Sequence, residues 1–211
     1  MAHMIPAGAG ARRQRMQPDE RRAQILDAAR GQFSERSYTT VSTAEIAAAA
    51  GVGRSLVHHY FGGAREVFAA VVADGGAALA DVRTAGPETP LDERLARNVA
   101  AGLDVVAANR ETWLAVAGHG TALADPGIRE LVLAAREHTV ERMLIANRDV
   151  VRDTPVARAL LRCYTTFSAE ATRAWLAGEQ TRASTEALLV AACRDLLLHT
   201  IPALERAAPT G

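Results

Sequence analysis

Residues 42–61 read Ser-Thr-Ala-Glu-Ile-Ala-Ala-Ala-Ala-Gly-Val-Gly-Arg-Ser-Leu-Val-His-His-Tyr-Phe, and this stretch decides the fold. The pattern predicts a short helix, a glycine turn and a second short helix. Ser42 and Glu45 have the spacing of a capping box, in which each side chain accepts a hydrogen bond from the backbone N–H of the other residue. Gly51 supplies the left-handed residue that ends the first helix. The stretch therefore predicts a helix-turn-helix.

The side chains of the second helix divide into two faces. The inward set is Leu56, Val57 and Phe61, and the outward set is Arg54, Ser55, His58 and His59. A helix with such a polar outer face fits the major groove of DNA. An ordinary helical hairpin is the alternative, and the flanking sequence decides between the two.

Further helices are predicted on both sides of this motif. Upstream, residues 21–33 place apolar side chains at one helical face, namely Ile25, Leu26, Ala29 and Phe33. Downstream, residues 65–72 begin another helix. The order Ile-Leu-x-Ala-Ala, Phe, Thr-x-x-x-Ile-Ala, Ala-Gly-Val and Tyr-Phe resembles the N-terminal domain of the TetR family of bacterial repressors over about residues 20–72. The resemblance implies a DNA-binding regulator.

The chain departs from the family pattern at a few positions. Ser37 stands where a glycine usually ends the first helix, Gly53 replaces a serine or threonine cap, and His58 replaces a common tyrosine. Ala64 occupies the place of a lysine that touches phosphate in the family. We expect Arg65, the next residue, to compensate for that loss.

The predicted DNA contacts fall into two groups. Side chains on the exposed N-terminal part of a recognition helix lie deepest in the groove, so Arg54, Ser55 and His58 are expected to contact base edges. Other polar groups hold phosphates and set the register of the protein on the duplex. This second group is Thr43, His59, Tyr60 and Arg65.

The formal net charge of zero hides an asymmetry. The 211 residues carry 24 basic and 24 acidic side chains, and all of the basic ones are arginine. Residues 1–65 hold nine arginines and five acids, which leaves fifteen and nineteen for residues 66–211. The helix-turn-helix therefore lies in the positive part, as phosphate binding requires.

The sequence predicts three segments. Residues 1–17, with Arg12, Arg13 and Arg15, form a flexible basic arm that reaches DNA or, as an equal alternative, a solubilising tail. Residues 18–64 form the helix-turn-helix domain. Residues 65–211 form a helical domain for ligand binding and dimerisation.

The composition and spacing of the C-terminal part predict only helices. We expect them over residues 65–84, 91–108 and 111–118, from the caps Asp125-Pro126 and Thr154-Pro155 onward, and from Ser184 to a stop or bend at Pro202. This makes an all-α protein of about nine helices. One face of the helix after Pro126 is expected to carry Ile128, Leu131, Ala135, His138, Arg142 and Ile145.

Two apolar stripes lie on the last long helices. One comprises Leu160, Tyr164, Phe167, Ala171 and Trp175, and the other comprises Leu189, Cys193, Leu196 and Thr200, widened by Leu188 and Ala192. The family resemblance implies that these helices pair into a four-helix interface of a homodimer. The alternative is that both stripes are buried within one subunit.

The remaining helices are expected to enclose an effector site. A mostly apolar cavity with a few polar groups suits a small, mostly apolar molecule. The candidate ligand-binding residues are Trp113, His119, His138, Arg142, Met143, Tyr164 and Phe167. Each of these residues has an ordinary packing role as its alternative.

The sequence argues against an enzyme. Adjacent His58 and His59 project about 100° apart on a helix and cannot share one metal ion. His138 and Glu141 have metal-bundle spacing, but the motif occurs once where two copies are needed. No nucleophile-elbow, P-loop or Rossmann glycine pattern occurs. We therefore expect no catalytic residues, no metal site and no cofactor.

The remaining features concern location. We find no apolar stretch of the roughly 20 residues that cross a bilayer, and no secretory signal, so we expect a cytoplasmic protein with no membrane partner. Cys163 and Cys193 are expected to be reduced packing residues.

Together these features predict a ligand-responsive repressor that leaves a palindromic operator when it binds its effector. A helical small-molecule carrier or sensor without DNA binding is the alternative. That alternative leaves the helix-turn-helix and its arginines without a purpose.

Overall fold

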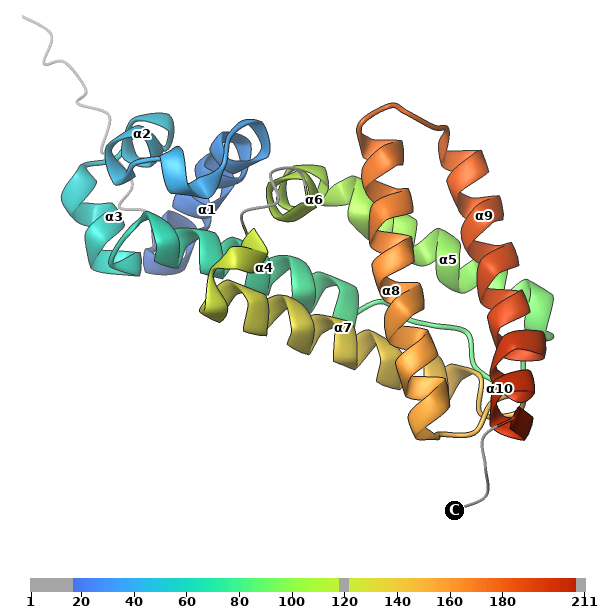
Figure 1. The fold of residues 1–211 in the computed structure, drawn as a ribbon. Helices are drawn as coiled ribbons and strands as arrows, with labels where there is room; N and C mark the ends of the chain where they lie inside the picture. The colour runs from blue at the N-terminus through green and yellow to red at the C-terminus, as the bar shows by residue number, and fades with distance from the viewer. Residues whose placement is uncertain (1–16, 118–121, 208–211) are drawn as a thin grey trace, which may run out of the picture.

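The computed structural model describes residues 17–117 and 122–207, and every regular element in these ranges is helical. The α-helices are α1 (Pro18–Glu35), α2 (Thr43–Ala49), α3 (Arg54–Phe61), α4 (Ala64–Ala80), α5 (Leu91–Ala108), α6 (Arg110–Ala117), α7 (Pro126–Ala146), α8 (Pro155–Leu176), α9 (Arg182–Asp195) and α10 (Ile201–Ala207). Helices α1–α3 gather at one end, α4 and α7 run side by side through the middle, and α8 and α9 stand at the other end (Figure 1). The all-α prediction is confirmed.

The helix-turn-helix begins and turns as its residues predict. The Ser42 backbone N–H donates to Glu45 Oε2 at 2.8 Å, and the Glu45 N–H donates to Ser42 Oγ at 3.2 Å, which completes the capping box. Gly51 has a φ of 64°, in the left-handed region where a glycine carries no Cβ penalty. Gly62 ends α3 with a φ of 94°.

Side-chain caps also start the later helices. Asp125 accepts from the backbone N–H groups of Gly127 and Ile128 at 2.9 and 3.1 Å and so begins α7, as expected. Thr154 caps α8 through the N–H of Ala157 at 3.1 Å. The last long helix begins earlier than expected. Thr181 caps it, which places Ser184 inside the first turn.

Pro202 does not terminate the last helix, which continues as α10. Residues Leu196–Thr200 form a π-helical turn between α9 and α10, and the N–H of Ile201 bonds to the carbonyl of Leu196. Because proline has no N–H and its ring presses on the preceding turn, the wider turn lets the helix continue past it. With α9 and α10 counted as one helix, the described residues contain nine α-helices, the expected number.

This continuous helix corrects one sequence expectation. Arg182–Ala207 is long and apolar enough to cross a membrane by length and composition, with a mean hydropathy of 1.5 over its most apolar window. Only 22% of that window is buried within the chain. One side of this helix, with Leu189, Cys193, Leu197 and Ile201, is buried in the subunit, whereas Leu188 and Leu204 are exposed.

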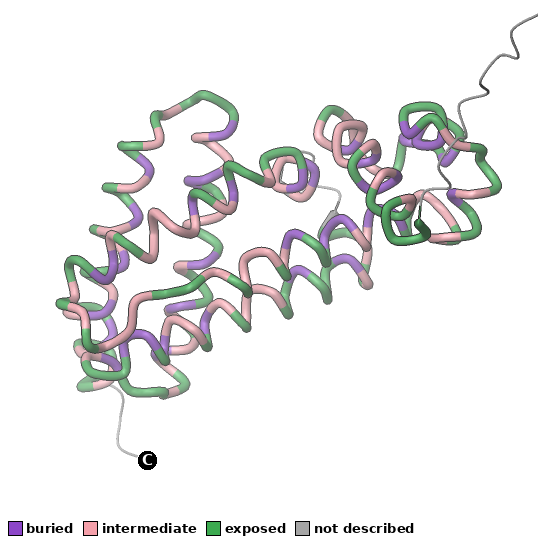
Figure 2. The backbone as a smooth tube through the Cα atoms, turned by 180° about the vertical axis from the view of Figure 1, so that it is seen from behind, coloured by how far each residue is buried: buried purple, intermediate pink, exposed green. Residues whose placement is uncertain are grey.

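The main hydrophobic core crosses from the N-terminal helices into the C-terminal ones. Side chains of α1–α4, with Phe33 and Phe68 edge to face at 5.1 Å, form one cluster with Ala115 of α6 and with Ile128 and Val132 of α7. Figure 2 shows buried residues on the facing sides of these helices and also among the helices at the other end of the molecule. The N-terminal helices are therefore joined to the C-terminal ones through α1 and α4, which pack against α6 and α7.

Two glycines let α4 lie close to both of its neighbours. A Cβ on Gly75 would lie 2.7 Å from Cγ2 of the buried Thr112, so α6 approaches α4 at a position where only a hydrogen fits. A Cβ on Gly76 would lie 3.4 Å from the Cβ of Ala135 on α7, which is an ordinary contact. Helix α4 is held between α6 and α7.

The residues expected along one line of α7 do not form its buried face. Leu131, His138 and Ile145 are exposed, whereas Val132, Val140 and Leu144 are buried. This long helix carries apolar side chains on two faces, and periodicity alone did not show which face meets α4 and α8. Of the residues expected along that line, Ile128 is fully buried, whereas three of the later ones are exposed.

The far end of the molecule contains a buried cation that the sequence did not suggest. Arg94 of α5 has a fully buried side chain, and its Nη2 donates to Asp149 at 3.0 Å while Nη1 donates to the carbonyl of Gly86 at 3.3 Å. These bonds join the segment before α5 to the segment after α7. A buried charge needs such partners, since an unpaired one is costly.

Candidate nucleic-acid interface

A chain of hydrogen bonds runs through the helix-turn-helix. Arg54 Nε donates to Thr43 Oγ1 at 3.1 Å, Thr43 Oγ1 lies 3.3 Å from His58 Nε2, and His58 Nδ1 lies 2.6 Å from the carbonyl oxygen of Gly62. Because a carbonyl oxygen only accepts, Nδ1 must donate to it. In the neutral ring Nε2 then accepts from the Thr43 hydroxyl, which in turn accepts from Arg54.

This arrangement gives Thr43 a different position from the one expected. Thr43 is only 7% exposed. Its hydroxyl lies between α2 and α3, where it makes hydrogen bonds with the side chains of Arg54 and His58. Its observed role is to position Arg54. The phosphate contact assigned to it from the sequence stays a prediction.

The other candidate DNA contacts of α3 lie at the surface. We use the name reading face for the exposed residues Arg54, Ser55, His58 and His59. Tyr60 is half-buried and meets His59 edge to face, with ring centroids 5.3 Å apart, so its ring supports the reading face from one side. The structure thus brings together the polar residues that the helix pattern placed outside.

Arg65 takes part in an ion pair within the chain. Its Nε donates to Asp125 Oδ2 at 2.7 Å and its Nη2 donates to Asp125 Oδ1 at 2.8 Å. The Arg65 guanidinium holds the pKa of the Asp125 carboxyl far below its ordinary value, and this carboxylate raises the pKa of Arg65. Sequence spacing gave no signal of this pair, because the two residues are 60 positions apart.

A second ion pair supports the start of α2. Arg36 Nη1 donates to Glu45 Oε1 at 2.9 Å, while the other Glu45 oxygen accepts from Ser42. Hydrogen bonds from Ser42, aided by Arg36, lower the pKa of Glu45 to about 2. The carboxylate is therefore charged wherever the capping box is needed.

The N-terminal arm and one ligand candidate fall beyond the described ranges. Arg12, Arg13 and Arg15 of the predicted arm belong to residues 1–16, and His119 belongs to residues 118–121. Both expectations lie outside the described residues.

Arg142, a candidate ligand residue, binds the end of α4. Its guanidinium donates to the backbone carbonyls of Leu79 and Val82, and also to that of Ala80 at 3.2 Å. The last carbonyls of a helix have no partner within it and carry its negative dipole end, so an arginine is favoured there. Burial lowers the pKa of Arg142, an effect that the nearby Asp81 partly opposes.

Tyr164 and Cys193 lie together in a core at the far end of the molecule. The Tyr164 hydroxyl donates to the carbonyl of Leu189 at 2.9 Å, which ties α8 to α9. Burial raises the pKa of Tyr164 and raises the pKa of the Cys193 thiol to about 12. Cys193 is therefore a packing residue as expected, whereas Cys163 is exposed on α8.

The other ligand candidates occupy different surroundings. Met143 packs in the same core as Tyr164, Phe167 lies partly over Tyr164 with centroids 6.3 Å apart, and His138 is exposed. The indole N–H of Trp113 on α6 is buried and makes no hydrogen bond within the described protein. The ligand-binding role of these residues stays a prediction.

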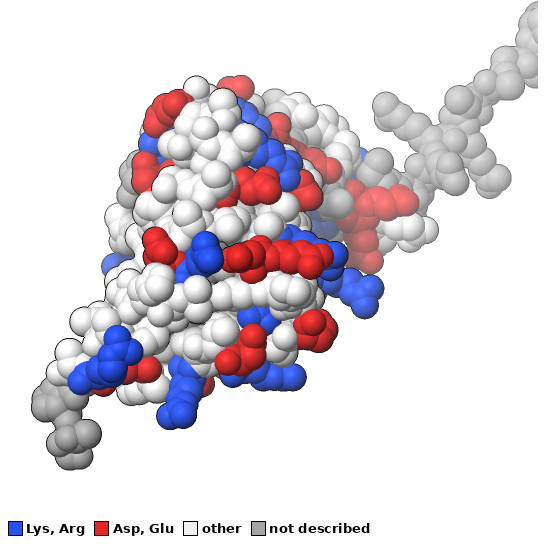
Figure 3. Space-filling view, turned by 90° about the vertical axis from the view of Figure 1, so that its right-hand side faces the viewer, with Lys and Arg blue, Asp and Glu red and all other residues white. Residues whose placement is uncertain are grey.

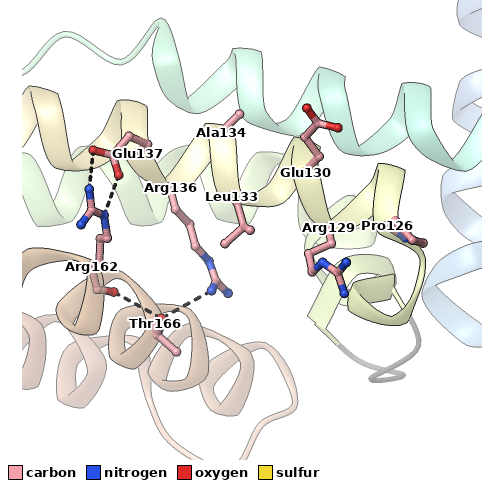
Figure 4. Close-up of a pocket in the computed structure, with 9 residues that line it drawn as sticks. All are labelled: Pro126, Arg129, Glu130, Leu133, Ala134, Arg136, Glu137, Arg162 and Thr166. Carbon is pink, nitrogen blue, oxygen red and sulfur yellow. Dashed lines mark hydrogen bonds and ion pairs between the residues drawn. The ribbon is translucent and has the colours of Figure 1, made fainter. Parts of the chain in front are cut away.

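Two concave surfaces are present on the C-terminal helices. The larger, of about 760 Å³, lies between α7 and α8 (Figure 4). It is lined by Pro126, Arg129, Glu130, Leu133, Ala134, Arg136, Glu137, Arg162 and Thr166. The smaller, of about 520 Å³, lies between α5 and α9. No candidate ligand residue lines either one.

The two apolar stripes on α8 and α9 divide between core and surface. Leu189 and Cys193 are buried within the subunit, whereas Phe167 and Leu188 are each 42% exposed. The side of the molecule that carries α9 shows wide uncharged surface between bands of paired acidic and basic groups (Figure 3). Burial within one subunit therefore accounts for part of each stripe only.

Comparison with known proteins gives matches to both halves of the chain. Residues 25–71 match the sequence pattern of the family described as bacterial regulatory proteins, tetR family. A stretch of 67 residues is 39% identical to the HTH-type transcriptional activator FasR of Mycolicibacterium smegmatis, and it covers 32% of this chain and 31% of FasR. That match thus spans about a third of the length of the activator.

Solved structures resemble most of the chain. A tetR-family transcriptional regulator from Streptomyces coelicolor is 29% identical, with a TM-score of 0.70 over 91% of this chain and 89% of that one. A TetR-family regulator from Syntrophomonas wolfei is 17% identical, with a TM-score of 0.69 over 86% and 96% of the two chains. The second likeness concerns the fold alone.

Proposed function

We propose that this chain, which belongs to the TetR family of bacterial regulatory proteins, acts as a homodimeric, ligand-responsive transcriptional repressor in the cytoplasm. The observation that supports this most is the hydrogen-bond chain from Arg54 through Thr43 and His58 to Gly62. It orients polar groups on an exposed helix of the kind that enters the major groove. A carrier without DNA binding has no use for such an arrangement.

The candidate DNA contacts of α3 divide into base contacts and phosphate contacts. Arg54, Ser55 and His58 contact base edges, and Arg54 is suited to a guanine because its fork matches two acceptors on one base. His59 and Tyr60 hold phosphates and set the register. Thr43 acts mainly by fixing the direction in which Arg54 points.

Dimerisation supplies the second reading face. One short helix reads few base pairs, whereas a twofold dimer reads two half-sites about one helical turn apart, and its operator is a palindrome. The exposed Phe167 and Leu188 mark the surface of α8 and α9 that a second copy covers. The same pairing covers the apolar side of Arg182–Ala207, which needs no membrane.

The effector is a small, mostly apolar molecule bound by the C-terminal helices. Helix α4 leads directly from the reading face and is held between α6 and α7, so a shift of either helix changes the spacing of the two reading faces. A ligand need only prefer the wrong spacing by a few kcal/mol to empty the operator.

The deciding experiment is a gel shift with DNA from immediately upstream of the gene for this protein. We expect a complex that survives excess random-sequence DNA, with a dimer as the bound species by light scattering. A stable monomer that shows no preference for the upstream fragment contradicts the proposal. A reporter driven by that fragment separates repression from activation, since FasR is named as an activator.

A further inference from the structure

Helix α7 holds α4 at both of its ends. At one end Arg142 of α7 binds the last carbonyls of α4, and at the other end Asp125, the cap of α7, binds Arg65 in the first turn of α4. The first tie involves a helix end that always needs donors. The second joins two side chains, and each has a second role: Asp125 caps α7, and Arg65 is a candidate phosphate contact.

The carboxylate of Asp125 is fully occupied. Its Oδ1 accepts from Arg65 Nη2 and from the backbone N–H groups of Gly127 and Ile128, and its Oδ2 accepts from Arg65 Nε and, at 3.5 Å, from the hydroxyl of Tyr38. The Asp125 side chain is 14% exposed and that of Arg65 is 48% exposed. The pair therefore lies at the surface with its carboxylate side anchored in the protein.

Arg65 is also close to the reading face along the chain. It lies three residues after Gly62, the residue that ends α3, and in the positive first turn of α4. Carboxylate and phosphate oxygens bind the same guanidinium edge in the same two-bonded manner. While Asp125 occupies that edge and neutralises its charge, Arg65 releases no counterion on approach to DNA.

We propose that Asp125 is an internal competitor for the DNA phosphate that Arg65 binds, so that the Arg65–Asp125 pair is an autoinhibitory latch between the start of α4 and the start of α7. The proposal rests on the proposed DNA-binding function. When the latch is closed, each subunit binds DNA with one cation fewer. Movement of the start of α7 away from α4 opens the latch and adds that cation to the interface.

The glycine at position 127 supports the latch. A Cβ on Gly127 would lie 2.6 Å from Arg65 Nη2, so the guanidinium rests on the first turn of α7 in space that any other residue would fill. Alanine is well tolerated in a helix, and the obstructing atom is the end of a flexible side chain. Gly127→Ala therefore displaces Arg65 and leaves the Asp125 charge in place.

The test measures affinity for a random-sequence duplex of about 30 base pairs at several salt concentrations, since phosphate contacts are independent of sequence. Asp125→Asn keeps a good helix cap and removes the charge. We expect several-fold tighter binding at low salt for Asp125→Asn and for Gly127→Ala. We also expect the slope of log K against log salt to steepen by about 0.9 for each arginine released.

Two controls make the outcome specific. Asp153→Asn removes the same charge from another two-bonded aspartate–arginine pair, with Arg158, and should leave affinity and slope unchanged. Adding Arg65→Gln to Asp125→Asn should cancel the gain. A gain that persists in this double variant, or an unchanged slope in Asp125→Asn with α7 still folded, overturns the latch.

Failure of the latch is distinct from failure of the proposed function. If the wild-type chain prefers its upstream fragment and Asp125→Asn does not change the slope, only the latch fails. If neither protein binds DNA, both proposals fail.

Discussion

At the scale of single residues, three side chains on the helix-turn-helix work as one unit. Arg54 points where it does because Thr43 accepts from its Nε, and Thr43 is oriented in turn by a histidine whose other nitrogen is fixed by the carbonyl of Gly62. Such orientation lowers the entropy that an arginine loses when it binds a base. The proposed base contact of Arg54 would therefore depend on a buried hydroxyl as well as on exposed groups.

Two substitutions separate these roles. Arg54→Ala should weaken binding to the upstream DNA fragment by about 1–3 kcal/mol and leave the dimer intact. Thr43→Val should cost about 1 kcal/mol, the typical value of one hydrogen bond, and Thr43→Ser should restore the affinity. Both are measured by fluorescence anisotropy. Equal affinities for Thr43→Val and the wild type would show that Arg54 needs no support.

Glu45 makes the stability of the helix-turn-helix depend on pH in acid. Its pKa is about 2 in the folded protein and 4.5 ordinarily, so its contribution is complete above pH 4.5 and is lost as the pH falls toward 2. Gln can still serve in a capping box but does not titrate. The melting temperature of wild type should therefore fall more steeply between pH 4.5 and 2 than that of Glu45→Gln; parallel curves would contradict this assignment.

At the scale of helices, the position of α4 depends on two adjacent glycines. Replacement of either by alanine gains helix propensity of up to about 1 kcal/mol. At Gly76 the new methyl meets Ala135 at an ordinary distance, whereas at Gly75 it meets the buried Thr112 at 2.7 Å. The two positions should therefore respond in opposite ways.

Urea unfolding tests this contrast. Gly76→Ala should raise the free energy of unfolding, and Gly75→Ala should lower it by about 1–3 kcal/mol, the usual cost of overpacking. Combining Gly75→Ala with Thr112→Ala should recover most of the loss. If Gly75→Ala stabilises the protein as much as Gly76→Ala, α6 is free to move away from α4.

The sequence predicts helices well where caps and glycines are local signals. The capping box at Ser42, the turn at Gly51 and the cap at Asp125 were all identified correctly, because each depends on residues within four positions. The buried face of α7 could not be predicted, since only packing against other helices selects it. The Arg65–Asp125 pair was missed, since nothing local links residues 60 positions apart.

The candidate sites show the same contrast between features that local sequence determines and features that packing between distant residues determines. The reading face was found because a helical period separates exposed from buried residues on α3. The ligand candidates were chosen by residue type, and side chains of suitable type on α6, α7 and α8 also serve as caps and packing groups. Arg142, which binds the end of α4, is the clearest example.

At the scale of the whole molecule, the proposed function requires two chains to pair. Phe167→Arg together with Leu188→Arg places charges on the exposed apolar surface of α8 and α9 without altering the buried residues Leu189 and Cys193. We expect a folded monomer by light scattering and circular dichroism, with loss of binding to the upstream fragment. A double variant that remains a dimer would place the interface elsewhere.

The core shared by α1, α4, α6 and α7 sets a limit on modular exchange. If residues 18–64 alone were transferred into another regulator, Ile25, Phe33 and their neighbours would lose the core packing that Ala115 and Ile128 provide. Hybrid regulators that keep their new operator preference should therefore need α6 and the first turns of α7 from the same parent.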